Sequence, residues 1–166
     1  TLNISDKNFQ WKELIGEKAY PISGASIAGD KLIINYLKDT ISQVEFYNLQ
    51  GKFLKELPYE NIGTLSGFNG RFDSNTTYFE FSNFTSPQRI YELDLKSLEY
   101  SLYWETTIKN LNINDYVSKL DFYQSKDGTK IPMHIAHTKD LEIDKDTPVL
   151  LYGYGGFNIP ILPYFS

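Results

Sequence analysis

The sequence predicts a mainly β fold, in which blades of a β-propeller are followed by the first strands of an α/β domain. Apolar and aromatic runs recur about every 10 residues, with turn signals between them, from residue 24 to residue 105. Two of these runs repeat at an offset of about 44 residues. A continuous apolar run near the C-terminus precedes a glycine-rich loop. These three observations carry the fold prediction.

The successive strands of the propeller part can be placed by alternation and turn residues. The expected strands are Lys31–Lys38, Ile41–Asn48, Lys52–Leu57, Gly63–Phe68, Thr76–Ser82, Gln88–Leu93 and Tyr100–Glu105. A tight turn at Asp39-Thr40 joins the first two. The aromatic content of 16% also favours strands.

The internal repeat distinguishes this region from an arbitrary run of strands. Val44–Leu49 aligns with Arg89–Leu95, and a period of about 40–50 residues with four strands per unit is typical of propeller blades. Two similar sandwich halves would give much the same pattern. Under the propeller interpretation, Val44–Tyr47 and Arg89–Tyr91 should occupy the same strand position in adjacent blades.

The strand rhythm stops near residue 106, and a different organisation follows. The polar segment Lys109–Asp115 is predicted to be a linker, so a domain boundary is expected near residue 108. After it, Leu120–Ser125 and Lys130–His137 flank Lys126-Asp127-Gly128-Thr129, a strong hairpin signal. Val149–Tyr152 is too short for a helix and too apolar for a strand with one wet face. It is predicted to be a strand buried on both faces, as in a parallel sheet.

Composition excludes several classes of function. The 166-residue chain has a net charge of −5 and no basic face, which argues against nucleic acid as a partner. It has no run of about 18 apolar residues, so no membrane span is expected. It has no cysteine, which excludes disulfides and thiolate metal sites. We expect a cytoplasmic protein, with a periplasmic or secreted location left open.

Histidines and acidic residues do not form a convincing metal site. His134 and His137 are three residues apart on an expected strand, so their side chains should point to opposite faces and cannot chelate one ion. The acidic residues between 140 and 146 lack the glycine bend of a calcium loop, and a solvated loop is expected. We therefore expect no metal and no cofactor.

The loop Gly153-Tyr154-Gly155-Gly156 is the strongest functional signal. Glycines let the backbone approach a ligand closely, and a glycine-rich loop leaving a central strand is where α/β hydrolases place oxyanion-hole donors. The phenol of Tyr154 is a hydrogen-bond donor at neutral pH. The alternative is an ordinary strand-end tyrosine that packs on a core. For Phe157 the alternatives are a wall of a binding pocket and core packing.

Three segments together resemble the prolyl oligopeptidase family of serine peptidases. They are Tyr78–Pro87 with Ile90–Leu95, Ser125–Met133, and Leu151–Asn158. They look like the family's last propeller blade, the first hairpin of its hydrolase domain and its glycine loop. The related oligopeptidase B usually departs from the last motif after its second glycine. The intact Gly155-Gly156-Phe157 therefore favours the proline-specific branch.

The resemblance implies roles for two residues and a division into two domains. Tyr154 would be catalytic, as an oxyanion donor, and Phe157 would be a substrate-binding residue that helps line the pocket for a proline ring. Residues 1–108 would be a partial β-propeller of about two blades plus a leading strand. Residues 109–166 would be the N-terminal part of an α/β-hydrolase domain. The implied partners are short proline-containing peptides and the remainder of the parent chain.

The catalytic triad of this family lies downstream of the glycine loop. Its nucleophile needs a Gly-x-Ser-x-Gly elbow, and the nearest approach here, Gly24–Ala28, lacks the closing glycine. The chain therefore resembles a middle fragment, truncated before the nucleophile and inactive alone. Two alternatives stay open: a related oligopeptidase with a different side-chain preference, and a non-catalytic β-propeller binding module.

Overall fold

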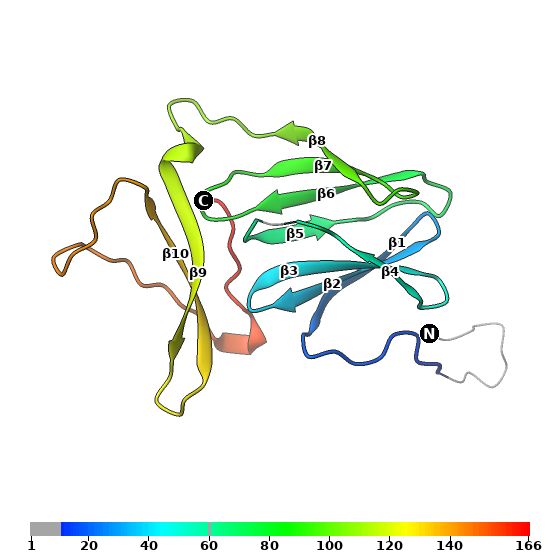
Figure 1. Ribbon diagram of the computed structural model, residues 1–166, viewed down its shortest axis with the longest axis horizontal. Helices are drawn as coiled ribbons and strands as arrows, with labels where there is room; N and C mark the ends of the chain where they lie inside the picture. The colour runs from blue at the N-terminus through cyan, green and yellow to red at the C-terminus, as the bar shows by residue number, and fades with distance from the viewer. Residues whose placement is uncertain (1–10, 60) are drawn as a thin grey trace.

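A computed structural model describes residues 11–59 and 61–166, and it contains two four-stranded antiparallel sheets and one separate hairpin (Figure 1). The first sheet consists of β1 (Ile22–Ala28), β2 (Lys31–Lys38), β3 (Ile41–Asn48) and β4 (Phe53–Glu56). The second consists of β5 (Thr64–Gly67), β6 (Thr76–Ser82), β7 (Arg89–Asp94) and β8 (Tyr100–Glu105). Each sheet has its strands in chain order, as in a propeller blade. The mainly β prediction is confirmed, and the seven expected strands match the observed ones to within one residue at each end.

The predicted repeat is also confirmed. Val44–Tyr47 lies in β3 and Arg89–Tyr91 lies in β7, and each of these is the third strand of its own sheet. The two segments are not paired with each other. The repeat therefore corresponds to two successive blades of the same topology.

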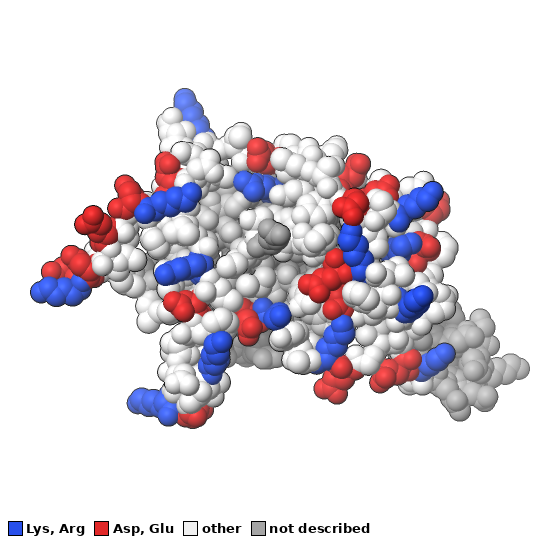
Figure 2. All heavy atoms as spheres, viewed as in Figure 1, with Lys and Arg blue, Asp and Glu red and all other residues white. Residues whose placement is uncertain are grey.

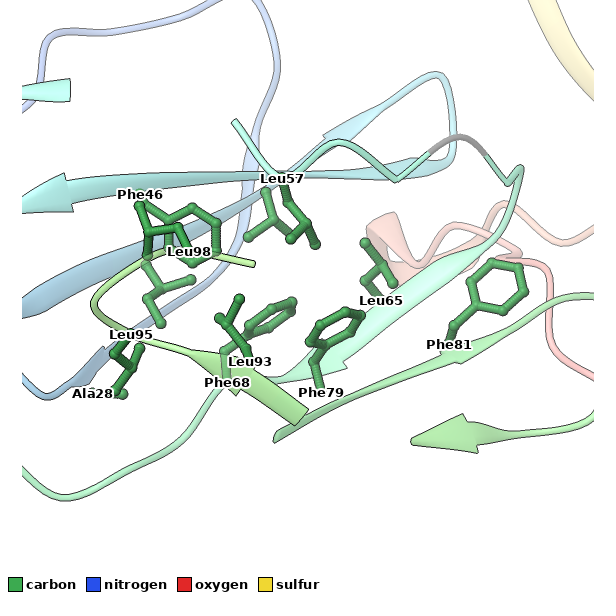
Figure 3. Packing of buried hydrophobic residues seen from close by; sticks show 12 residues of the cluster. Ala28, Phe46, Leu57, Leu65, Phe68, Phe79, Phe81, Leu93, Leu95 and Leu98 are labelled. Atoms are coloured by element: carbon green, nitrogen blue, oxygen red, sulfur yellow. The ribbon is translucent and has the colours of Figure 1, made fainter. Parts of the chain in front are cut away.

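The core lies between the two sheets because each sheet has one continuous apolar face. Figure 3 shows Phe46 and Leu57 of the first blade facing Phe68, Phe79 and Leu93 of the second. Alternation along each strand produces these faces: in β6, residues 77, 79 and 81 are buried and the residues between them are more exposed. Burying the two faces against each other holds the blades together.

Aromatic rings fill the centre of this core. Phe79 stacks on Phe68 at 4.9 Å between ring centroids and on Tyr91 at 5.1 Å. Tyr59, in the connection between the blades, packs edge-on against Phe79, and its hydroxyl lies 3.1 Å from that of Tyr91. Burial, together with that hydrogen bond, raises the pKa of Tyr59. The connection between the blades is thus part of the core.

The outer face of the first blade is covered by the segment that precedes β1. Tyr36 and Tyr47 are buried on this face, and Glu45, on β3 two residues before Tyr47, has only 5% of its surface exposed. The ammonium of Lys18 contacts the Glu45 carboxylate at 2.5 Å. Burial works against the Lys18 charge, but hydrogen bonds to Glu45 and Tyr47 still raise the pKa of Lys18. This ion pair, with the carboxylate buried and the ammonium partly exposed, ties the leading segment to the blade.

A 3₁₀ turn, η1 (Ile113–Asp115), leads into the hairpin of β9 (Tyr116–Gln124) and β10 (Lys130–Thr138). The predicted hairpin is confirmed, although β9 begins four residues earlier than expected, at Tyr116 rather than Leu120. Gly128 has φ of 86°, as its turn requires. The Asp127 carboxylate accepts hydrogen bonds from the Ser125 hydroxyl and the Thr129 N–H, which lower its pKa to about 2.

The predicted buried strand Val149–Tyr152 is wrong for this structure. These residues form no strand, and their exposed fractions run from 73% for Tyr152 to 94% for Leu150. A strand buried on both faces needs paired neighbours and covering layers. Within residues 11–59 and 61–166 there is no α-helix and no parallel strand pair, so nothing pairs with this run or covers it. The expected burial of Tyr152 is wrong for the same reason.

We predict that Phe79→Ala destabilises the chain by about 3–5 kcal/mol, because it empties the centre of a core that cannot fully collapse. Phe79 is only 1% exposed. Urea unfolding followed by circular dichroism measures the change. Phe72→Ala is the matched control, since Phe72 is 68% exposed and its loss should change stability by less than about 0.5 kcal/mol. Equal losses in the two variants would contradict this core.

Candidate functional site

In chain order, the glycine loop lies between the hairpin and the terminal segment of residues 159–166. It ends in the short 3₁₀ turn η2 (Gly156–Asn158). Beyond it, the chain is anchored to the second blade: Thr64 Oγ1 donates to the carbonyl of Pro163 at 3.1 Å, and the Phe165 N–H donates to Ser82 Oγ at 3.0 Å. Figure 1 shows this terminal segment returning to the ends of β5 and β6. The loop is therefore fixed on its C-terminal side by the propeller.

Tyr154 folds back over the backbone of Gly156. A Cβ atom at position 156 would lie 2.8 Å from the Tyr154 hydroxyl oxygen and 3.0 Å from its Cζ. A side chain at this position would push the Tyr154 ring aside, so Gly156 leaves room for the ring where it lies. Cβ atoms at Gly153 and Gly155 would meet nothing within 4 Å. Of the three glycines, Gly156 is therefore the one at which a side chain would collide with Tyr154.

The hydroxyl of Tyr154 remains free to bind a ligand. The side chain is 49% exposed. Among residues 11–59 and 61–166, its hydroxyl makes no hydrogen bond. A half-exposed phenol with an unused O–H can donate to an oxygen brought to the loop.

Phe157 lies in the same loop but points away from the core. Its side chain is 90% exposed, so core packing does not account for it here. Its φ of 57° is left-handed, a conformation that costs a non-glycine residue about 1 kcal/mol or more. Tyr154 and Phe157 are three residues apart in the sequence, and neither lines the 330 Å³ cavity between β1 and β5 described below. Their predicted roles stay predictions.

A cavity of about 330 Å³ lies between the edge strands of the two blades, β1 and β5. Leu162 and Tyr164 of the terminal segment contribute to its wall. The other polar lining groups are hydroxyls and amides, and no Asp, Glu, His, Lys or Arg lines it. Asn35 donates to the Leu65 carbonyl at 2.8 Å, while its Oδ1 is buried without a partner. With no charged group in its walls, this cavity offers polar contacts to a neutral group.

Other classes of site find no support in the part of the chain that is described. In residues 11–59 and 61–166, no group of three or more His, Cys, Asp or Glu side chains could hold a metal ion. No helix of these residues has the length and apolar character needed to cross a membrane. On the face shown in Figure 2, Lys and Arg are interspersed with Asp and Glu and form no continuous basic area.

Sequence reasoning weighed His134 as a metal ligand and missed its actual contact. His134 Nε2 lies 2.7 Å from Thr40 Oγ1, in the turn between β2 and β3. A signal was present in the sequence, because Thr40 occupies a turn position that normally favours glycine. His137 is bound differently: its Nδ1 lies 2.7 Å from the carbonyl of Thr138.

Two successive four-stranded antiparallel blades define a partial β-propeller. Residues 1–106 match the family described as "Prolyl oligopeptidase, N-terminal beta-propeller domain". This match spans more than half of the chain, and the chain belongs to the prolyl oligopeptidase family.

Named relatives agree with this assignment. A prolyl endopeptidase of Elizabethkingia miricola is 38% identical over 156 residues, which is 94% of this chain and 22% of the relative. A prolyl endopeptidase of Dictyostelium discoideum is 35% identical over 165 residues, which is 98% of this chain and 22% of the relative. The chain thus spans about a fifth of the length of these relatives.

Solved structures have the same arrangement. One, from a study of two prolyl endopeptidases and their inter-domain dynamics, has a TM-score of 0.86 and 36% identity, and the match covers 94% of this chain and 23% of that one. Prolyl oligopeptidase B of Galerina marginata, bound to a 25mer macrocyclization substrate, has a TM-score of 0.89 and 26% identity, with 99% of this chain and 23% of that one covered.

We predict that Gly156→Ala displaces the Tyr154 ring from its position over the loop, because the added Cβ would overlap the hydroxyl. The overall stability should change little, since the loop is exposed. Chemical shifts of the Tyr154 ring, in a sample with labelled tyrosine, report the movement. Gly153→Ala is the matched control and should leave these shifts unchanged, because its Cβ would enter open space. Similar shift changes in both variants would show that the ring is not held over Gly156.

Proposed function

We propose that this chain is part of a longer serine oligopeptidase that cleaves short peptides after proline. The propeller part would restrict access to short peptides, and the glycine loop would supply one oxyanion donor and one wall of the substrate pocket. The observation that carries the proposal is Tyr154, whose hydroxyl is free and whose ring is held over Gly156. Membership of the prolyl oligopeptidase family supports it.

Tyr154 would act on the transition state of peptide-bond cleavage. Attack of a serine on the scissile carbonyl puts negative charge on its oxygen, and a donor aimed at that oxygen lowers the barrier by about 3–4 kcal/mol. The phenol fits this role because it donates without carrying a charge of its own. In residues 11–59 and 61–166 no carboxylate or carbonyl takes up its O–H, so the donor would be available when the charge develops.

Phe157 would form a flat apolar wall for the proline ring. Proline has no N–H and offers mainly apolar surface, which suits an aromatic surface in a pocket. The 90% exposure of Phe157 supports a role toward another molecule or another part of the longer protein.

In the longer protein, Val149–Tyr152 would become the buried strand that its sequence indicates. The support is the exposure of four consecutive apolar residues, which is costly in water. Strands supplied by the rest of the hydrolase domain would pair with this run. The loop would then leave the end of a central strand, which is where α/β hydrolases place such donors.

A non-catalytic binding module is the second candidate, and β8 is the observation that favours it. Tyr103 and Trp104 are exposed on this edge strand, and Tyr78 packs edge-on against Tyr103 at 5.0 Å. Exposed aromatic rings of this kind can bind peptides or sugars. Activity measurements separate the two candidates, because a binding module has no transition state to stabilise.

In the full-length protein, Tyr154→Phe should lower kcat and kcat/KM together by a factor of about 10²–10³, with KM little changed, because only the donor to the transition state is lost. Steady-state kinetics on a Gly-Pro reporter peptide with a rate-limiting chemical step measures this. Phe157→Ala is the contrast and should mainly raise KM. Near-full kcat in Tyr154→Phe would overturn the assignment. A preference for a basic reporter peptide would favour a related oligopeptidase instead.

The 166-residue chain alone should show no peptidase activity above background and no labelling by a serine-directed phosphonate. Its sequence has no Gly-x-Ser-x-Gly elbow to present a nucleophile. Hydrolysis of the Gly-Pro reporter and mass spectrometry of the labelled protein test this expectation. Stoichiometric labelling at any serine would contradict it.

A further inference from the structure

Three separate parts of the chain meet at His134. The imidazole lies on β10 of the hairpin, with its Nε2 2.7 Å from Thr40 Oγ1 in the β2–β3 turn. The ring of Phe84, from the loop between β6 and β7, packs edge-on against it at 5.6 Å. Both blades therefore contact the hairpin through one histidine.

The hydrogen-bond roles at this junction follow from the neighbouring groups. With the Thr40 hydroxyl donating to the carbonyl of Asp39, the Thr40 oxygen is available as an acceptor, and the neutral tautomer that carries its proton on Nε2 fits the contact. In the neutral ring, Nδ1 is then unprotonated. This atom is buried and has no partner within residues 11–59 and 61–166. The contact is thus compatible with the neutral ring and leaves no acceptor for a second ring proton.

The turn is held in an unfavourable conformation at this contact. Asp39 and Thr40 have φ values of 49° and 69°, and a positive φ is a genuine outlier for a β-branched residue such as threonine. Glycine or asparagine would adopt this conformation more easily. Threonine, however, provides the hydroxyl that accepts from His134. The strain and the contact thus occur at the same residue.

The Phe84 side of the junction is equally well fixed. The amide oxygen of Asn83 accepts from the N–H groups of Thr85 and Ser86 at 2.9 Å and 2.7 Å. Its amide nitrogen donates to the carbonyl of Ile62 at 2.9 Å. These bonds fix the short loop that carries Phe84. The ring therefore faces His134 from a rigid position.

Among residues 11–59 and 61–166, no charged group shifts the pKa of His134. Burial lowers the pKa of this imidazole. In the β2–β3 turn the neighbouring charged residues are Lys38 and Asp39, and the loop of residues 83–88 has none. On β9, Lys119 and Asp121 flank Leu120, the cross-strand partner of His134, and alternation turns them to the opposite face of the hairpin.

We propose that His134, Thr40 and Phe84 form a pH-sensitive latch, which holds the hairpin against the two blades while His134 is neutral and releases it when Nδ1 is protonated. The added proton comes from solvent, and Nδ1–H must find water, which requires the junction to open. The latch is a property of this chain, and it does not depend on the catalytic role proposed for Tyr154.

The direction of the pH effect follows from linkage. An open junction exposes the imidazole, which then has its ordinary pKa of 6.5, whereas in the closed junction the pKa is lower. The open form therefore binds the proton first as the pH falls. The closed form is fully favoured above about pH 6.5, and the ratio of open to closed rises by up to about tenfold per pH unit below it. The ratio of open to closed stops rising once the pH falls below the lowered pKa that His134 has in the closed junction.

The 166-residue chain allows a clean test because it contains no cysteine. Cysteines introduced at Lys126, in the hairpin turn, and Lys52, at the exposed end of the first blade, would carry two spin labels. Pulsed electron paramagnetic resonance would measure the distance distribution between pH 7.5 and 5. We expect one population at high pH and a second, separate population that grows below about pH 6.5.

Three variants make the result specific. His134→Gln keeps an N–H for Thr40, and His134→Phe keeps a ring against Phe84. Neither side chain can titrate, so both variants should give distance distributions that do not change with pH. His137→Gln removes the only other histidine and should behave like the wild type. A pH-independent distribution in the wild type, or a pH-dependent one in either His134 variant, would overturn the proposal.

Discussion

The mutual burial of two apolar sheet faces is the constraint on which the rest of this structure depends. Neither blade could keep Phe46 or Phe79 out of water by itself, because a single antiparallel sheet leaves one face exposed. Stacking the two blades buries the apolar face of each, and it places their edge strands β1 and β5 on either side of a cavity. The remaining parts are attached to this core. The ion pair of Lys18 and Glu45 holds the leading segment, and the hydroxyls of Thr64 and Ser82 hold the terminal segment.

The features that the sequence could predict are those with a local cause. Strands and turns follow from alternation and from residues such as Gly128, so their positions were correct to within a few residues. The repeat was visible because β3 and β7 meet the same packing demand in each blade. Burial of Val149–Tyr152 was not a local property. An apolar run indicates that a segment tends to be buried, but the partners that bury it lie elsewhere in space.

The candidate site shows the same division. A glycine loop with a tyrosine could be found by pattern, and the structure explains the choice of Gly156 by the position of the Tyr154 ring. The contact of His134 with Thr40 spans 94 residues of sequence, and no periodicity connects them. The one hint in the sequence was Thr40 in a two-residue turn. Threonine adopts the positive φ of this turn with difficulty, so its presence indicated that its side chain has a role there.

The exposed run Val149–Tyr152 has a consequence for how such a chain behaves at high concentration. It is uncharged, apolar and unpaired, and short segments of that kind join strands from other molecules into aggregates. Pro148 stands directly before it and Gly153 directly after it. Proline cannot donate to a growing ladder and glycine weakens one, so the two residues act as gatekeepers that confine intermolecular pairing to four residues. The residues that flank this run thus limit its pairing with other molecules while it is exposed.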